Sequence, residues 1–290
     1  MTAQPDVRQN KSRVRIILRA VRSDWRLALG VTGLGFIVLV AVVSRFWTPH
    51  DPAIVVASDR LLPISLTHPL GTDHLGRDIV SQLMVGAWNS IQVGIFGTGS
   101  ALVVGVVVGG AAAMMGGRRE DLLMRLVDVL IAFPAILAAM MLAGKLGAGN
   151  ATAVIAVAIA LAPVVSRITR SAARQVLTRD FITAARAYGR GPVRIYLRHV
   201  IPNIGPILIV QATVLFAVAF LAEAALSFLG LGAQPPIPSW GRMLRDAQSY
   251  FQVYPSLAIW PGVCIMFTVL SLNFIGDGLR DALSPERVDE

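Results

Sequence analysis

Long apolar runs separated by short charged segments organise this sequence of 290 residues. A helix that crosses the hydrocarbon core of a membrane needs about 20 mostly apolar residues. The weakest candidate, residues 124–145, carries Asp128, Pro134 and Lys145, but its apolar second half still favours a span. Five further stretches meet the length readily: residues 27–47, 91–116, 147–166, 204–228 and 256–276. The pattern therefore predicts an all-α membrane protein with about six transmembrane helices.

Small residues recur inside these runs. Glycines stand at 105, 109 and 110, and alanines alternate through residues 156–162. Because lipid gives helices no hydrophobic reason to associate, small residues that let two backbones approach closely are typical of helix contacts in membranes. We expect helix backbones to approach closely at these positions.

The composition agrees with a chain that faces lipid. Hydrophobic residues make up 55% of the chain and charged residues only 15%, whereas a soluble domain carries about 25% charged residues. The net charge of +9 could suggest nucleic-acid binding. However, the basic side chains lie in short segments between apolar runs and form no patch interleaved with aromatic residues. We therefore expect membrane lipid, and no nucleic acid, among the partners.

The distribution of Lys and Arg predicts the orientation. With the N-terminus inside, the inner segments hold 20 of these residues and the outer segments six, and positive charge favours the cytoplasmic side. The first apolar run is too long for a signal peptide, so we expect it to remain as a span. The expected divisions are a cytoplasmic basic segment (1–26), a first transmembrane helix (27–47), an extracytoplasmic loop (48–90), a five-helix core (91–276) and a cytoplasmic tail (277–290).

The inner segment 167–203 is amphipathic and too long for a simple turn. Gly189 is expected to end a first short helix, and Pro192 to open a second. Both helices repeat apolar residues at helical spacing, so each has one apolar face. The faces are Phe181, Ala184, Ala185 and Tyr188 in the first helix, and Val193, Tyr196, Leu197 and Val200 in the second. We expect both helices to lie at the inner membrane surface, too short to span it.

Two interpretations of this helix pair stay open on physical grounds. Its arginines could hold it on anionic lipid as a pair of interfacial helices. Alternatively, its small alanines and apolar face could dock in a groove on a soluble partner, with the same arginines supplying electrostatic complementarity.

The same segment resembles a known signature. Residues 184–189 read Ala-Ala-x-x-x-Gly, and residues 199–203 read His-x-Ile-Pro-Asn. This is similar to the Glu-Ala-Ala-x-x-x-Gly signature, with a downstream His-x-Leu-Pro-Asn, of the permeases of binding-protein-dependent ABC importers. Thr183 stands where that family has glutamate. A salt bridge from that carboxylate to an ATPase is therefore unavailable here, and Thr183 can only hydrogen-bond.

Other segments resemble one branch of this family, the second or "C" type of dipeptide, oligopeptide and nickel permeases. The outer segment 68–78 reads HPLGTDHLGRD and is similar to the HPLGTDxxGRD of that branch. Residues 223–232 (EAALSFLGLG), 238–244 (PSWGRML) and 273–285 (NFIGDGLRDALSP) also resemble it. The resemblance extends from the first span to residue 287.

The resemblance implies a type I ABC importer permease in the bacterial plasma (inner) membrane, where it forms half of a pathway for peptides or a small solute such as nickel. It implies a second homologous permease, two ABC ATPase subunits or domains, and an extracytoplasmic solute-binding protein. ATP and Mg would be bound by the ATPases, and no cofactor by this chain. The residues expected to couple to the ATPases are Thr183, Ala184, Ala185, Tyr188, Gly189 and Arg190.

The chain is not expected to be an enzyme. Its only lysines, Lys11 and Lys145, lack the Gly-x-x-x-x-Gly-Lys context of a phosphate-binding loop, and no catalytic residue is assigned. The alternative function is an ion-coupled secondary transporter or a channel. Such carriers usually place carboxylates or broken helices near the membrane midplane, whereas the charges here avoid the middle of the spans.

The outer motif combines turn-forming and charged residues. Its glycines suggest tight turns, and Arg77 could pair with Asp73 or Asp78, so we expect a structural turn or a binding-protein contact. His68, Asp73 and His74 could offer metal ligands, but their spacing matches no strong metal motif and no metal site is expected. The motif residues are His68, Gly71, Thr72, Asp73, Gly76, Arg77 and Asp78.

Four polar residues within or near spans are candidates for the pathway or for structural pairing. An ionised carboxylate in a span is costly unless it faces a partner or water. For Asp128 and Glu223 we therefore expect pairing, with Arg167 or Arg170 as partners of Asp128. Gln211 and Asn273 are weaker candidates to line the pathway.

Overall fold

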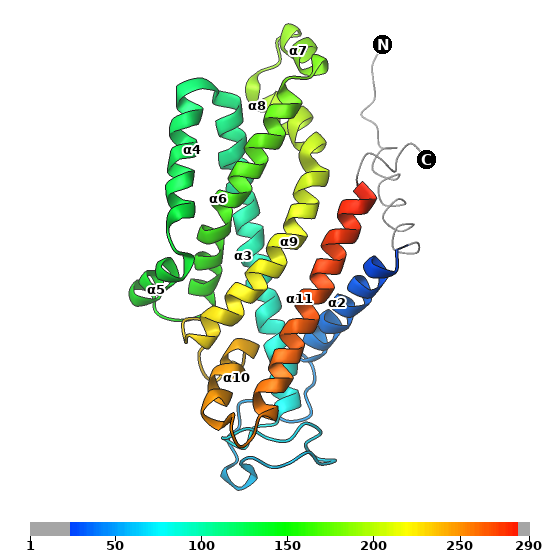
Figure 1. Cartoon of the computed structure of the whole chain (residues 1–290), viewed down its shortest axis with the longest axis vertical. Helices are drawn as coiled ribbons and strands as arrows, with labels where there is room; N and C mark the ends of the chain where they lie inside the picture. Colours follow the sequence, from blue (N-terminus) through cyan, green and yellow to red (C-terminus); the bar gives the residue numbers. More distant parts are fainter. Residues whose placement is uncertain (1–23, 284–290) are drawn as a thin grey trace.

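The computed structural model describes residues 24–283 and shows an elongated helical bundle (Figure 1). The long helices are α2 (Trp25–Val43), α3 (Ile79–Met115), α4 (Gly117–Ala132), α5 (Ala135–Leu146), α6 (Asn150–Leu177), α9 (Ile201–Phe228) and α11 (Ser256–Leu283). The short elements are 3-10 turns (Ala57–Asp59, Gln248–Tyr250), α7 (Asp180–Ala187), α8 (Pro192–Ile195), a π-helical turn (Tyr196–Val200) and α10 (Trp240–Ala247). The expected basic segment up to residue 23, and residues 284–290 of the expected tail, lie outside this range.

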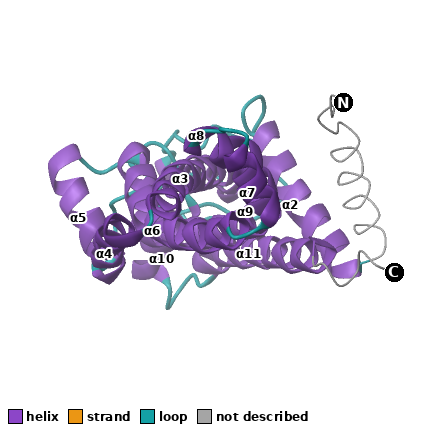
Figure 2. Ribbon diagram, turned by 90° about the horizontal axis from the view of Figure 1, so that it is seen from above, coloured by secondary structure: helices purple, strands orange, loops and turns teal. Residues whose placement is uncertain are grey.

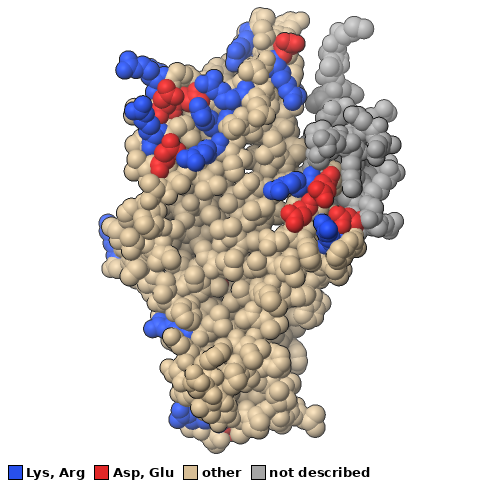
Figure 3. Space-filling model, in the orientation of Figure 1, with Lys and Arg blue, Asp and Glu red and all other residues tan. Residues whose placement is uncertain are grey.

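The helices confirm the all-α membrane class. Between residues 24 and 283, five are long and apolar enough to cross a membrane, or up to six if the bent pair α4–α5 forms one span. Charged side chains gather around α7 and the neighbouring ends of α4 and α6, and again beside α2 and α11, while the middle of this face is largely uncharged (Figure 3). We call the end with α7 the charged end, and the opposite end, with residues 44–78 and α10, the loop end (Figure 1).

The expected span 124–145 is not one straight helix. α4 and α5 meet at an angle of 84°. Pro134 causes the break, because it has no N–H to donate and its ring disfavours helical geometry in the preceding residue. Phe133 accordingly adopts extended geometry, with φ −81° and ψ 127°.

The expected loop 48–90 ends earlier than the pattern suggested. α3 begins at Ile79 and not at 91, because Asp78 caps its N-terminus by accepting a hydrogen bond from Ser81 N at 2.8 Å. With 37 residues, α3 is about 56 Å long, which exceeds the hydrocarbon thickness of about 30 Å. The helix is therefore longer than the apolar layer, and sequence hydropathy marked only its most apolar part.

The second short helix of segment 167–203 is also not separate. From Pro192 to Phe228 the chain forms one helix of 37 residues that crosses the bundle. The π-helical turn at Tyr196–Val200 accommodates Pro202, which cannot donate a backbone hydrogen bond, and Asn203 Nδ2 donates to His199 O at 2.7 Å. α6 likewise continues to Leu177. The connection between them, residues 178–191, contains α7 and forms the tip of the charged end (Figure 1).

Glycines set the central helix contact. Viewed along the bundle, α3, α6 and α9 occupy the middle, with α4 and α5 on one side and α2 and α11 on the other (Figure 2). α3 packs closely along α6. A Cβ added at Gly105 would lie 2.4 Å from Val165 Cβ, and one at Gly109 would lie 2.2 Å from Ser166 O. Only glycine permits this approach, which agrees with the expectation from the sequence.

We predict that Gly109→Val destabilises the bundle by about 3 kcal/mol, because the Ser166 carbonyl is backbone and cannot move aside. Gly99→Val is the matched control, since Gly99 lies in the same helix and no atom of residues 24–283 lies within 4 Å of its added Cβ. Both carry the same cost in helix propensity. Thermal unfolding of the two variants in detergent measures the difference, and equal melting temperatures would contradict the role of this contact.

Candidate functional site

The charged end is formed by a sharp corner that we call the elbow, residues 178–191, between α6 and α8. α7 packs against other helices of the same chain, because Ile182 and Ala185 are buried in an apolar cluster. The other buried members of this cluster are Ala113, Ala172, Ala173, Val176, Ile195, Val200 and Ile204. The elbow is therefore anchored on the ends of α3, α6 and α9.

The expected apolar face of α7 divides into an inner and an outer part. Ala185, expected to couple to an ATPase, is only 6% exposed and packs inward. Ala184 lies outside this cluster and is exposed, as is Phe181, and Tyr188 is 87% exposed. Val193 and Leu197 continue the exposed surface beyond the corner, at 70% and 58%. Helical spacing predicted one apolar face for Phe181, Ala184, Ala185 and Tyr188. In the structure, α7 instead packs on the bundle through Ile182 and Ala185.

Gly189 makes the corner possible. Its φ is +73°, a conformation that costs a side-chain-bearing residue roughly 1–2 kcal/mol. Gly189 N donates to Arg186 O at 2.9 Å, and Arg190 N donates to Ala185 O at 3.2 Å, which is the pairing of a Schellman C-cap. Among the described residues, no atom lies within 4 Å of an added Cβ. The requirement for glycine is therefore one of backbone geometry and not of space.

Two side-chain contacts fix the far side of the corner. Arg190 Nη1 donates to His199 Nε2 at 2.7 Å and joins the elbow to the π-helical turn. Tyr196 Oη donates to Val106 O at 2.6 Å, and its ring occupies the space beside Gly110. His199 of the downstream motif therefore helps to hold the elbow, and Gly110 of the second span leaves room for the Tyr196 ring.

Glu120 is a site residue that the sequence did not reveal. It is 1% exposed, accepts a hydrogen bond from Arg170 Nε at 2.6 Å and pairs with Arg174 as well, which ties α4 to α6. The sequence suggested Arg167 or Arg170 as partners of Asp128. Asp128 pairs with Arg167, and Arg170 is taken by Glu120. The only feature of the sequence that could have indicated this site is the spacing of Arg170 and Arg174, which lie one helical turn apart on the same face of α6.

The outer motif 68–78 folds into a compact knot of hydrogen bonds. Asp73 accepts from Leu75 N at 2.8 Å, Arg77 N at 2.9 Å and Gln82 Nε2 at 2.9 Å. It also forms an ion pair with Arg77 at 2.7 Å. Thr72 Oγ1 accepts from Leu62 N at 2.8 Å. The two carboxylates of the motif thus have different structural roles. Asp73 closes the turn, and Asp78 caps α3.

Gly71 and Gly76 allow the turns that the sequence suggested. Their φ angles are +82° and +78°. A Cβ at Gly76 would lie 1.9 Å from Val56 O, so the motif is pressed against the preceding loop.

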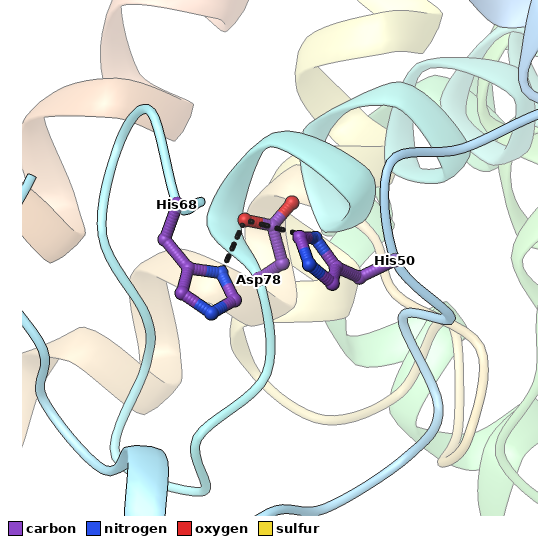
Figure 4. A group of neighbouring side chains, drawn as sticks. All are labelled: His50, His68 and Asp78. Carbon is purple, nitrogen blue, oxygen red and sulfur yellow. Dashed lines mark hydrogen bonds and ion pairs between the residues drawn. The ribbon is translucent and has the colours of Figure 1, made fainter. Parts of the chain in front are cut away.

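His68, Asp73 and His74 do not meet within the described range. The ring of His74 stacks on Tyr250, with centroids 5.2 Å apart. His68 Nδ1 instead lies 3.0 Å from Asp78 Oδ1, and His50 approaches the same carboxylate (Figure 4). No pattern in the sequence pointed to His50, because it follows the first span at a distance from the motif.

The remaining polar candidates are dispersed. Glu223 is 1% exposed and accepts from Ser90 Oγ and Ser227 Oγ, each at 2.7 Å, which links α9 to α3. This is structural pairing inside the bundle. Gln211 is half-buried on α9, and Asn273 is exposed on α11.

The fold and the elbow together define a class: a multi-pass membrane protein with an exposed, well-anchored corner at one end. Residues 101–288 match the family of the binding-protein-dependent transport system inner membrane component, and the chain belongs to this family. It is accordingly a permease subunit of an ABC importer in the bacterial plasma membrane. ATP hydrolysis in such importers is carried out by separate subunits, so the chain itself is not an enzyme.

Relatives and solved structures agree with this family. The chain is 41% identical to the dipeptide transport system permease protein DppC of Alkalihalophilus pseudofirmus, over 91% of this chain and 90% of that protein. It is 36% identical to the nickel transport system permease protein NikC of Escherichia coli, over 92% and 97%. A chain of the inward-facing MetNI methionine ABC transporter has a TM-score of 0.59 at 19% identity, over 70% of this chain and 97% of that chain.

We predict that Glu120→Ala lowers the free energy of unfolding by about 2 kcal/mol, because it leaves two arginines without their buried partner. The value is below the usual cost for a fully buried pair because both arginines are partly exposed. Asp121→Ala is the control, since Asp121 is the exposed neighbour on the same helix. Thermal unfolding in detergent compares the two, and an equal loss for both would show that the Glu120 network contributes nothing.

Proposed function

We propose that this chain forms half of the translocation pathway of an ATP-driven peptide importer and receives the motion of its ATPases through the elbow. The observation that carries this proposal is the exposure of Tyr188 on the elbow, whose backbone is fixed, and of Val193 and Leu197 directly after it. Exposed large apolar side chains on a well-anchored surface mark an interaction site. A helix whose apolar side chains enter a groove is a common docking mode.

The coupling residues are those of the elbow that face outward. Thr183, Ala184, Tyr188, Gly189 and Arg190 are all exposed. Ala185 acts indirectly, because it holds α7 on the rest of the bundle. Thr183 offers a neutral hydroxyl in place of the family carboxylate, so the contact with the ATPase relies on shape and on the surrounding arginines.

The charged end faces the cytoplasm in this proposal. The exposed arginines of the elbow and the charges around α4 and α6 support this orientation, because basic residues are retained on the cytoplasmic side. The loop end then faces the outside and meets the solute-binding protein through the motif 68–78. A second homologous permease completes the pathway, and two ATPase subunits or domains bind ATP and Mg.

The cargo is proposed to be a peptide. The dipeptide permease relative is 41% identical and the nickel permease relative 36% identical. Both relatives match nearly the whole chain and share its motifs, so the preference for a peptide rests on this difference in identity. In such systems the separate binding protein is expected to select the cargo.

We expect Gly189→Val to reduce peptide uptake at least tenfold while membrane insertion stays normal, because valine does not tolerate the left-handed backbone and the corner would be lost. Gly191→Val is the matched control: Gly191 lies beside the same corner, has a φ of −68° and is also surrounded by open space. Uptake and ATPase activity are measured in proteoliposomes with the co-purifying subunits. Normal uptake by Gly189→Val at normal expression would refute the coupling role.

The cargo is tested in cells with and without the chain. Labelled dipeptide uptake should depend on the chain, fall at least tenfold with excess unlabelled dipeptide and stay unchanged with excess Ni²⁺. If loss of the chain lowers nickel accumulation and leaves dipeptide uptake intact, the cargo is the metal. Transport by a homo-oligomer without ATPase subunits would instead favour an ion-coupled carrier.

A further inference from the structure

Three segments that are separate in the sequence meet beside the N-terminus of α3. His50 follows α2, His68 opens the outer motif, and Asp78 caps α3 (Figure 4). One potential ligand atom from each residue lies within 4.8 Å of the other two. The two imidazoles approach the same carboxylate, with ring centroids 4.5 Å apart. This convergence is not needed for capping the helix, which uses Asp78 and Ser81 alone.

The distances suit a small cation. His68 Nδ1 lies 3.0 Å and His50 Nδ1 3.8 Å from Asp78 Oδ1. Ligands that coordinate a tetrahedral ion at about 2.0–2.1 Å are about 3.3 Å from one another. The two observed separations lie on either side of this value, so small side-chain rotations would bring the three atoms into coordination geometry.

The carboxylate is oriented in advance. Asp78 Oδ2 accepts from Ser81 N and Ser81 Oγ, both at 2.8 Å, which leaves Oδ1 to face the imidazoles. His50 N donates to Ser81 Oγ at 3.0 Å, so the backbone that carries this histidine is tied to the same turn of α3. Supporting hydrogen bonds that orient a ligand are a regular feature of metal sites.

The surrounding charges also favour a cation. The three residues line a cavity of about 450 Å³ that is lined by Asp51 and Asp59 as well. Arg77 borders the cavity, but its guanidinium is engaged by Asp73 at 2.7 Å and lies 3.8 Å from Asp246. Its guanidinium is therefore paired with other carboxylates and not with Asp78.

We propose that His50, His68 and Asp78 bind one divalent transition-metal cation of the zinc type. Imidazole nitrogen suits such ions, whereas Mg²⁺ and Ca²⁺ prefer oxygen ligands alone. His68 coordinates through Nδ1 as the neutral imidazole with its proton on Nε2, so the ion replaces the hydrogen bond to Asp78. The ion pins the loop after α2 and the outer motif onto α3. It is a resident structural ion and not the cargo.

The test uses the full-length chain, purified without a polyhistidine tag, together with its co-purifying subunits. After chelator treatment and desalting, Zn²⁺ binding is titrated by calorimetry, and Co²⁺ is added to detect coordination by its visible absorption. The variants are His50→Ala, His68→Ala and Asp78→Asn, the last chosen because asparagine still caps a helix. His74→Ala is the control, because His74 lies in the same loop but outside the cluster.

We expect the parent protein and His74→Ala to bind Zn²⁺ alike and to gain thermal stability from it. His50→Ala should bind at least tenfold more weakly and lose the gain in melting temperature. His50 is the decisive position because its side chain is 43% exposed, so its removal leaves the fold intact. Equal affinity of His50→Ala and the parent protein, or no Zn²⁺ binding by the parent protein, would overturn the proposal.

Discussion

The close approach of α3 and α6 is the contact on which the rest of the structure depends. In lipid, apolar side chains gain nothing by leaving the solvent, so two helices associate only where their backbones come close enough for dispersion to add up. Gly105 and Gly109 remove the Cβ atoms that would separate the helices. Once these two helices are joined, α4 is held by Glu120, and α9 by Glu223 and the apolar cluster around α7.

Much of this fold follows from hydropathy, and the errors have physical causes. Apolar runs located five long helices because the requirement for about 20 apolar residues is set by the membrane. The apolar runs could not show where a helix continues beyond the membrane. α3 starts at a polar cap, and the helix through Pro202 survives because a π-helical turn absorbs the missing hydrogen bond. The same reasoning missed the bend at Pro134, where proline acts as a breaker instead.

The candidate sites were predictable only where their residues are close in the sequence. The elbow and the knot at residues 68–78 are local, so spacing and turn chemistry indicated them. Glu120 meets arginines some fifty positions away, and His50 joins a motif that begins after an intervening loop. No periodicity encodes such encounters. Spacing also cannot say which apolar stripe of a short helix faces inward: it placed Ala185 on one face with Phe181 and Tyr188, whereas Ala185 packs inward beside Ile182.

The continuity of the helices on either side of the elbow has a mechanical consequence. α6 has 28 residues and is about 42 Å long, and the helix that starts at Pro192 is longer still. In the proposed coupling, both helices act as levers that are moved at the elbow. A tilt of about 10° at the elbow displaces the far tip of a rod of this length by about 7 Å. Pro163 lies within α6 and Pro206 within α9, and prolines are the points at which such helices bend. Part of the displacement would therefore appear as bending at these two positions.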